Sequence, residues 1–184
     1  MKIIDCFLYF DEDMLLDLRL NILDKYVDKF VIVEADLDHA GNKRQPQFNI
    51  SNFKKFKNKI NYFLIKDLPS HNNFYKENWG PSWRRENYQR NALELGYKDC
   101  DQNDLIMISD LDEIPNPTKI CDFDNKYKYG CFVQKNFCMK FNLLNDTQPN
   151  WFGTRICKKK YLKSPQWLRE IKIKRRPFYQ FFKP

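Results

Sequence analysis

The chain has 184 residues, of which 42% are hydrophobic and 16% aromatic, and its formal net charge is +8. This size and apolar content are typical of one folded domain and exclude a disordered chain. No run of 18 apolar residues is present, which excludes a membrane-spanning helix, and Asp5 interrupts the apolar start where a signal peptide would be continuous. We therefore expect a cytoplasmic protein, whose positive charge allows peripheral contact with an anionic membrane surface.

The first third of the chain predicts a strand, an amphipathic helix and a second strand. Residues 2–10 form an apolar run, and the acids at 11–13 favour the start of a helix. Arg19 is assigned to the solvent-facing side of that helix. Residues 30–33 form the second buried strand, which ends in Glu34. The apolar residues that recur at helical spacing and predict the buried stripe are Leu15, Leu18, Ile22, Leu23 and Tyr26.

The middle of the chain continues the alternation of strands and helices. A polar loop over 36–49 contains His39, and a short basic helix over 52–57 leads to a third strand over 60–65. After a loop at 69–79, the pattern predicts a helix over 81–95, which Pro81 starts and Gly96 ends, and a fourth strand over 104–109. This alternation predicts an α/β fold in which helices cover both faces of a mostly parallel sheet.

Beyond residue 117 the pattern changes to longer, mixed strands, which we place at 130–144 and 154–162. A basic and aromatic tail follows them. Six cysteines, at positions 6, 100, 121, 131, 138 and 157, lack the C-x-x-C spacing of zinc sites. In a chain without a secretion signal, we expect them to be free thiols.

Three carboxylates, Asp110, Asp112 and Glu113, follow the fourth predicted strand directly. Two prolines just beyond them end the strand, so the acids lie in a turn at its carboxyl end. Open α/β sheets bind their ligands at that end. Because Asp110 and Asp112 are two residues apart on an extended backbone, they point the same way and can converge on one divalent cation.

Two other interpretations of these acids are open. Aspartate favours turns, so the acids could form only a polar turn. In a phosphatase, Asp110 would be the nucleophile and Asp112 the general acid. That reaction needs a small residue followed by threonine or serine after Asp112, whereas this chain has Glu113, Ile114 and Pro115. The phosphatase interpretation is therefore the weaker one.

Taken together, the sequence resembles glycosyltransferase family 17. The most specific matches are the Arg-Glu-Asn-Tyr-Gln-Arg-Asn-Ala stretch at 85–92 and the Ser-Asp-Leu-Asp-Glu-Ile-Pro stretch at 109–115. The matching residues run in order over about residues 3 to 165. They are Ile4 to Phe7 with Phe10, Leu18 to Leu20 with Leu23, Val27 to Ala35, His39 to Gly41, Arg85 to Ala92, Asp104 to Pro117, and Trp151 with Gly153 and Thr154.

The resemblance implies a nucleotide-sugar-dependent transferase with the A-type glycosyltransferase fold, whose central sheet is Rossmann-like. The donor would be a UDP-linked sugar, N-acetylglucosamine or another hexose, and an inverting reaction would pass it to a glycan or saccharide acceptor. Asp110 and Asp112 would bind the Mn²⁺ or Mg²⁺ ion that bridges the donor diphosphate, and Glu113 is the one local candidate for the general base. Donor contacts would come from Glu34, His39, Arg85, Arg90 and Asn91.

We expect one domain over 1–184, with a nucleotide-sugar-binding half at 1–117 and an acceptor-side half at 118–184. Family members continue into a Gly-Gly-Trp-His-Phe-Ser-like tract that carries acceptor-side residues, and no such tract follows Leu168. A shortened acceptor half leaves a second function open, a non-catalytic module that binds a nucleotide sugar or another anion. A nucleic-acid partner would explain the charge of +8 but not the acids at the strand end, so we do not expect one.

Overall fold

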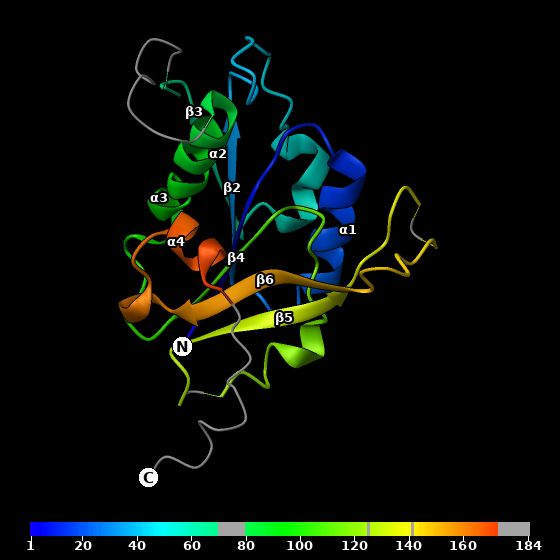
Figure 1. Ribbon diagram of the computed structural model, residues 1–184. Helices are drawn as coiled ribbons and strands as arrows, with labels where there is room; N and C mark the ends of the chain where they lie inside the picture. Colours follow the sequence, from blue (N-terminus) through cyan, green and yellow to red (C-terminus); the bar gives the residue numbers. More distant parts are fainter. Residues whose placement is uncertain (70–79, 125, 141, 173–184) are drawn as a thin grey trace.

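Figure 1 shows the computed structural model, which describes residues 1–69, 80–124, 126–140 and 142–172. A six-stranded sheet with the order β3-β2-β1-β4-β6-β5 forms its centre. The first four strands along the chain pair in parallel, whereas β6 and β5 are antiparallel additions at one edge. The predicted α/β class with a mostly parallel sheet is therefore confirmed. The strands are β1 (Ile3–Leu8), β2 (Lys29–Ala35), β3 (Ile60–Ile65), β4 (Leu105–Ser109), β5 (Tyr129–Lys135) and β6 (Asn150–Lys158).

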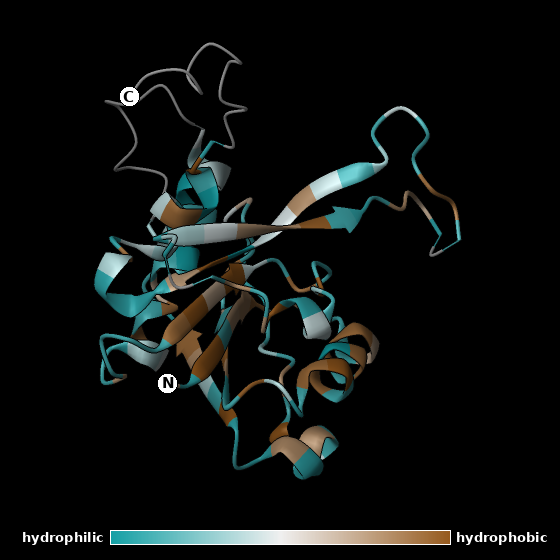
Figure 2. Ribbon diagram, turned by 90° about the horizontal axis from the view of Figure 1, so that it is seen from below, coloured by the Kyte–Doolittle hydropathy of each residue, from teal (hydrophilic) through white to brown (hydrophobic). Residues whose placement is uncertain are grey.

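Helices cover both faces of this sheet, as predicted (Figure 1). The face that carries Leu105 and Met107 packs on α1 (Asp13–Leu23) and on the 3₁₀ helix η1 (Ile50–Phe56). The opposite face carries Ile106 and Ile108, which belong to the same buried cluster as residues of α3 and α4. Figure 2 shows the hydrophobic residues concentrated on the central strands. The helices over this second face are α2 (Pro81–Asn91), α3 (Glu94–Tyr97) and α4 (Pro165–Glu170).

Helix α1 buries a different stripe from the predicted one. Leu18 and Ile22, which we assigned to the core, are 46% and 37% exposed. Arg19, which we assigned to solvent, is fully buried, and its guanidinium group donates to both carboxylate oxygens of Asp5 in β1 at 2.7 and 2.9 Å. The helix is rotated because an acid in the neighbouring strand provides a partner for the arginine.

Helix α2 also departs from the prediction, both in its length and in its buried face. The predicted helix over 81–95 is interrupted after residue 91, and the next helix, α3, contains Gly96 instead of ending at it. In a helix over 81–95, helical spacing would place Trp83, Tyr88, Ala92 and Leu95 on one apolar stripe, but Tyr88 and Leu95 are 40% and 44% exposed. The residues that α2 buries are polar: Arg85, Gln89 and Arg90. Gln89 donates to the carbonyl oxygen of Val33 in β2, and Arg90 donates to the carboxylate of Asp110 just after β4.

We expect Gly96→Ala to lower the free energy of unfolding by about 1 to 3 kcal/mol, the usual cost of overpacking a core. A Cβ atom at this position would lie 2.2 Å from Cγ1 of Val31 in β2, so α3 would have to move off the sheet. Gly80→Ala is the matched control, because no atom lies within 4 Å of its added Cβ. Urea unfolding of both variants measures the difference, and equal stabilities would contradict the close packing of α3 on β2.

The antiparallel strands begin and end earlier than predicted. Strand β5 ends at Lys135 and β6 begins at Asn150, so much of the predicted strand at 130–144 belongs to the loop of a hairpin. In Figure 2 this hairpin projects beyond the rest of the sheet. The predicted loop at 69–79 lies outside the described residues except for Pro69, and so does the basic tail after Lys172. All six cysteines are free, as predicted, and none of the described helices is long and apolar enough to cross a membrane.

Candidate functional site

The three acids lie in the acidic turn, residues 110–115, which follows β4 at the carboxyl end of the parallel strands. The chain winds outward from β1 through β2 to β3 and then places β4 on the other side of β1. The strand order therefore reverses between β1 and β4. Such a reversal opens a crevice beyond the strand ends, and this is where open α/β sheets bind ligands.

The backbone of the acidic turn is held from two sides. From α1, Arg19 donates to three of its carbonyl oxygens at 3.0 to 3.3 Å. From β6, the hydroxyl group of Thr154 donates to the carbonyl oxygen of Glu113 at 2.6 Å. From β5, the amide of Gln134 donates to the carbonyl oxygen of Ile114 at 2.8 Å. Because these bonds satisfy the turn's carbonyl groups, its side chains are presented from a fixed backbone.

Asp110 is flanked by two arginines. Its Oδ1 atom accepts from Nη2 of Arg90 at 2.9 Å, and its Oδ2 atom accepts from Nη2 of Arg169 at 2.8 Å. Arg90 also pairs with Glu86 one turn earlier on α2 at 2.5 Å. Burial opposes the charge of Arg169, but the carboxylates of Asp110 and Glu113 outweigh it and raise the pKa of this guanidinium group. The negative charge of Asp110 is thus balanced within the protein.

Glu113 is the most enclosed acid of the turn, with 6% of its surface exposed. Its Oε1 atom accepts from the indole N–H of Trp151 at 2.6 Å and from Arg169 at 3.0 Å. Its Oε2 atom accepts from the backbone N–H of Asp110 at 3.0 Å and from Arg169 at 2.6 Å. With both oxygens engaged, Glu113 fastens α4 and β6 to the turn, and its predicted role as general base stays a prediction that this geometry does not favour.

Asp112 differs from the other two acids of the turn, Asp110 and Glu113. It is exposed, and its carboxylate forms no ion pair within the described part of the chain. Partial desolvation of its carboxyl group, together with the nearby carboxylates of Glu113 and Asp110, raises its pKa. A cation bound at this position would relieve that repulsion. Asp112 is therefore the acid of the turn that is most available to a ligand.

A cavity of about 460 Å³ opens on one side of the acidic turn, and we call it the donor-side cavity. The end of β1, the start of α1, the loop at His39 and helix α2 form its walls together with the turn. It lies at the strand reversal between β1 and β4, which is where a ligand is expected. Its lining residues are Leu8, Tyr9, Phe10, Glu12, Leu15, His39, Glu86, Gln89, Arg90, Asp110, Leu111 and Asp112.

Two of the predicted donor contacts, His39 and Arg90, line this cavity. Nε2 of His39 lies 3.0 Å from Oε1 of Gln89, so the helix orients the imidazole ring. Arg85 lies outside the cavity lining and acts on the loop instead. It is 2% exposed and donates to the carbonyl oxygen of His39 at 2.9 Å. Gly41 provides the room for it, since a Cβ there would lie 2.8 Å from Nη2 of Arg85 and its φ of +96° favours glycine.

The other two predicted donor contacts, Glu34 and Asn91, do not line the donor-side cavity. Glu34 is fully buried, and its oxygens accept from Arg44 at 2.8 Å, from Tyr62 at 2.8 Å and from two backbone N–H groups of the loop at 36–49. Asn91 accepts from the backbone N–H of Gln166 and so holds the start of α4. The geometry gives both residues a structural role, and contact with a donor stays a prediction for them.

A second cavity, of about 310 Å³, opens on the other side of the acidic turn, and we call it the hairpin-side cavity. It shares Asp110 and Asp112 with the donor-side cavity, so these two carboxylates stand in the wall between the two spaces. Its other walls come from β5, β6 and the start of the hairpin loop. They are Glu113, Gln134, Lys135, Asn136, Phe137 and Trp151.

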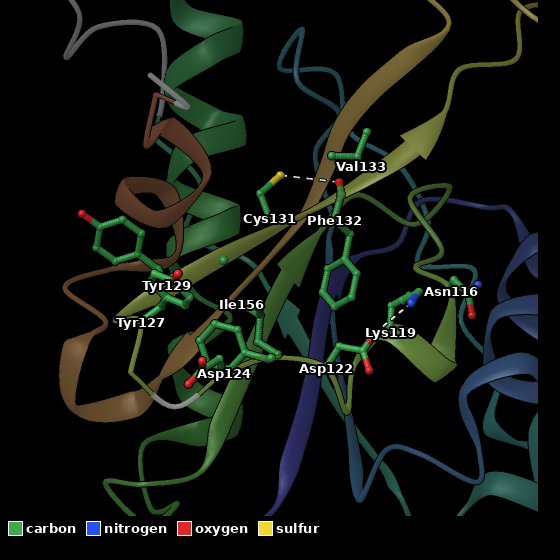
Figure 3. A pocket seen from close by; sticks show the side chains of 12 residues that line it. Asn116, Lys119, Asp122, Asp124, Tyr127, Tyr129, Cys131, Phe132, Val133 and Ile156 are labelled. Carbon is green, nitrogen blue, oxygen red and sulfur yellow. Dashed lines mark hydrogen bonds and ion pairs between the residues drawn. The ribbon is translucent and has the colours of Figure 1, made fainter. Parts of the chain in front are cut away.

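Figure 3 shows a third cavity, of about 450 Å³, along the outer edge of β5. Phe132 points into it, and the ion pair between Lys119 and Asp122 lines it. It shares no lining residue with the two cavities at the acidic turn. We therefore do not place donor or acceptor binding there.

Asp110 and Asp112 are the residues of the turn that could hold a divalent metal ion. No group of three or more histidine, cysteine, aspartate or glutamate side chains in the described residues could hold one by itself. Mg²⁺ and Mn²⁺ commonly take one or two carboxylates and complete their shell with water and substrate phosphate. Asp112, which lines both cavities and has no ion pair in the described residues, fits that mode when Asp110 exchanges one of its arginine contacts for the ion.

Several residues of the site escaped the sequence prediction. Gln89 and Trp151 belong to segments that carry the family resemblance, so their motifs contained the signal although no role was assigned to them. Arg19 could have been found from Asp5, an acid in the middle of a buried strand that needs a cationic partner. Nothing in the sequence pointed to Arg169, because its partners are 56 and 59 residues away.

The comparison with protein families matches residues 1–151 to Glycosyltransferase family 17, while the curated proteins contain no match to the chain. The matched span includes the four parallel strands, the acidic turn and Trp151. It ends before α4, so Arg169 lies outside it. Sugar transfer is the activity that defines such a family. Because the match covers most of its length, this chain belongs to glycosyltransferase family 17.

Proposed function

We propose that the chain is a metal-dependent transferase with the A-type glycosyltransferase fold. It would move a sugar, N-acetylglucosamine or another hexose, from a UDP-linked donor to a glycan or saccharide acceptor. The observation that carries this proposal is the position of Asp110 and Asp112 between two cavities, one of which opens at the strand reversal. A donor in one cavity and an acceptor in the other would meet at these carboxylates.

The donor-side cavity offers groups suited to a nucleoside diphosphate. Arg90 is buried and held in place by Glu86 and Gln166 at 2.5 and 2.6 Å, so its guanidinium group is oriented before any ligand arrives. A planar guanidinium group can donate to two phosphate oxygens at once. His39 and Gln89 add polar groups at the other wall, where they can contact the ribose or the base.

Asp112, with Asp110, would hold the metal ion, which when bound would neutralise charge on the leaving diphosphate. The protein's own part is to keep these carboxylates in place. Arg19 and Thr154 hold the backbone of the turn, and Glu113 is engaged by Trp151 and Arg169. The site is thereby arranged before the substrate binds, which is the condition for electrostatic stabilisation of a transition state.

Arg90→Lys is expected to weaken the binding of UDP by about 1 to 3 kcal/mol, the value of a hydrogen bond to a charged group. A lysine keeps the charge but cannot make two parallel bonds to phosphate. Isothermal titration of UDP in the presence of Mn²⁺ measures this loss, and thermal melting of the same samples checks the fold. Arg84→Lys, on the same helix but outside the lining of both cavities, is the matched control.

Three results would oppose this assignment in different ways. Equal binding of UDP by Arg90→Lys and the wild type would remove Arg90 from the donor contacts. Binding that does not depend on Mn²⁺ would oppose the metal. Binding of UDP without hydrolysis or transfer in any nucleotide-sugar assay would support the alternative function, a non-catalytic module that holds a nucleotide sugar.

A further inference from the structure

We infer that the hairpin-side cavity is the acceptor subsite and that it binds an uncharged sugar ring against Phe137 and Trp151. This inference rests on the proposed sugar transfer and adds the class of acceptor and the residues that recognise it. The two cavities share Asp110 and Asp112 as lining residues. A saccharide hydroxyl group in the hairpin-side cavity would face Asp110 and Asp112, on whose other side the donor-side cavity lies.

The position of Trp151 follows from the pairing of β6. Strand β6 pairs with β4 only from Arg155 onward, so its first residues extend past the carboxyl end of β4 and lie beside the acidic turn. There the indole N–H of Trp151 donates to Glu113 at 2.6 Å. The bond fixes the indole group, which is still 42% exposed. The ring is thus held at the cavity without being packed into a core.

Phe137 is the second aromatic residue of the cavity and is 45% exposed. It lies just beyond β5, where an isolated antiparallel bridge to Leu144 holds the backbone of the hairpin loop. Exposed aromatic rings beside polar groups suit a sugar, because the C–H face of a pyranose packs on a ring while its hydroxyl groups form hydrogen bonds. Asn136 and the carboxylate of Asp112 supply such polar groups in the same cavity.

The charges around the cavity favour a neutral sugar over an acidic one. Asp110 and Glu113 are neutralised by arginines, as their ion pairs show. Asp112 carries the remaining negative charge, and the ammonium group of Lys135 in the same wall can balance it. Among the described residues that line this cavity, no surplus of positive charge is left to compensate the desolvation of a carboxylate on the sugar. An uncharged pyranoside therefore fits this wall better than a glucuronide.

Strand β6 supplies a matched control for this inference. Phe152 follows Trp151 directly and has nearly the same exposure, 45% against 42%. Because neighbouring residues of a strand point to opposite faces, Phe152 lines a different cavity, next to Arg155 and Leu168. Removal of its ring changes the exposed aromatic surface by a similar amount but leaves the hairpin-side cavity unchanged.

The test uses NMR of a ¹⁵N-labelled sample and follows the indole N–H resonance of Trp151. This resonance is assigned as the signal that is missing from the spectrum of Trp151→Phe. Methyl α-mannoside, methyl β-galactoside, chitobiose and methyl glucuronide are titrated in the presence of UDP and Mn²⁺. We expect at least one neutral saccharide to shift this resonance and to bind more tightly than the glucuronide. Phe137→Ala should raise its Kd by about fivefold or more, the effect of losing one aromatic contact, whereas Phe152→Ala should leave it within about twofold.

Three results would overturn the inference: no saccharide shifts the resonance, the glucuronide binds most tightly, or Phe137→Ala binds the sugar as the wild type does. UDP is titrated with Mn²⁺ into saccharide-free samples of the same proteins, which separates this failure from failure of the proposed function. If UDP binds with Mn²⁺ but these saccharide results appear, the acceptor subsite is wrong and donor binding stands. If UDP does not bind the wild type, the proposed function fails.

Discussion

Asp112→Asn is expected to lower sugar transfer by about 100-fold or more, as loss of one charge-stabilising group in an active site does. Asparagine has nearly the same shape as aspartate but carries no charge, so it cannot replace a carboxylate ligand of Mg²⁺ or Mn²⁺. Asp112 is also the acid of the turn without an ion pair in the described residues, so no arginine loses its partner. Turnover of a nucleotide-sugar panel and titration of UDP with Mn²⁺ measure the loss.

The stability of this variant distinguishes a functional role from a structural one. The pKa of Asp112 is raised, which means that the fold disfavours its charged form. The contribution of this group to stability is therefore unfavourable above its folded pKa, and a neutral asparagine removes it. We expect Asp112→Asn to melt at or above the wild-type temperature at neutral pH. Asp124→Asn, at an exposed aspartate that pairs with Lys126, is the control and should keep full turnover. Normal turnover of Asp112→Asn would show that the metal assignment is wrong.

The largest expected effect on stability comes from Arg19→Met, which should cost about 3 to 5 kcal/mol, the usual cost of breaking a buried ion pair. The substitution leaves the carboxylate of Asp5 buried without its partner. It also removes the donor for the hydroxyl group of Ser109 at 2.5 Å and for three carbonyl oxygens of the acidic turn. Urea unfolding at neutral pH measures the loss, with Lys25→Met as an exposed control just beyond the end of α1.

A double variant separates the effect of losing the ion pair between Arg19 and Asp5 from the effect of losing the hydrogen bonds from Arg19 to the acidic turn. When Asp5→Leu is added to Arg19→Met, no buried charge is left unpaired, so part of the lost stability should return. The carbonyl oxygens of the turn still lack their donor, so UDP binding should stay weaker than in the wild type. If Arg19→Met is as stable as Lys25→Met, Arg19 does not hold the fold as its contacts indicate.

The sequence by itself determined the succession of strands and helices along the parallel half and the place of the acidic turn after its fourth strand. Strand β3 has the predicted bounds of residues 60–65, and β4 differs from its predicted start by one residue. Both are short apolar runs bounded by polar residues or turns, so local preference and burial agree. The turn after β4 was predictable for the same reason, because Pro115 and Pro117 end the strand whatever surrounds it.

The tertiary structure alone decided which charged residues are buried and what they contact. Helical spacing in α1 was compatible with more than one buried face, and the position of Asp5 in β1 determined that Arg19 points inward. The same holds for Glu34, a predicted donor contact, whose carboxylate is buried among donors from the loop at 36–49 and β3. A buried charge is stable only beside its partner. Since those partners are distant in the chain, as Arg169 is from Asp110, the folded structure is needed to bring them together.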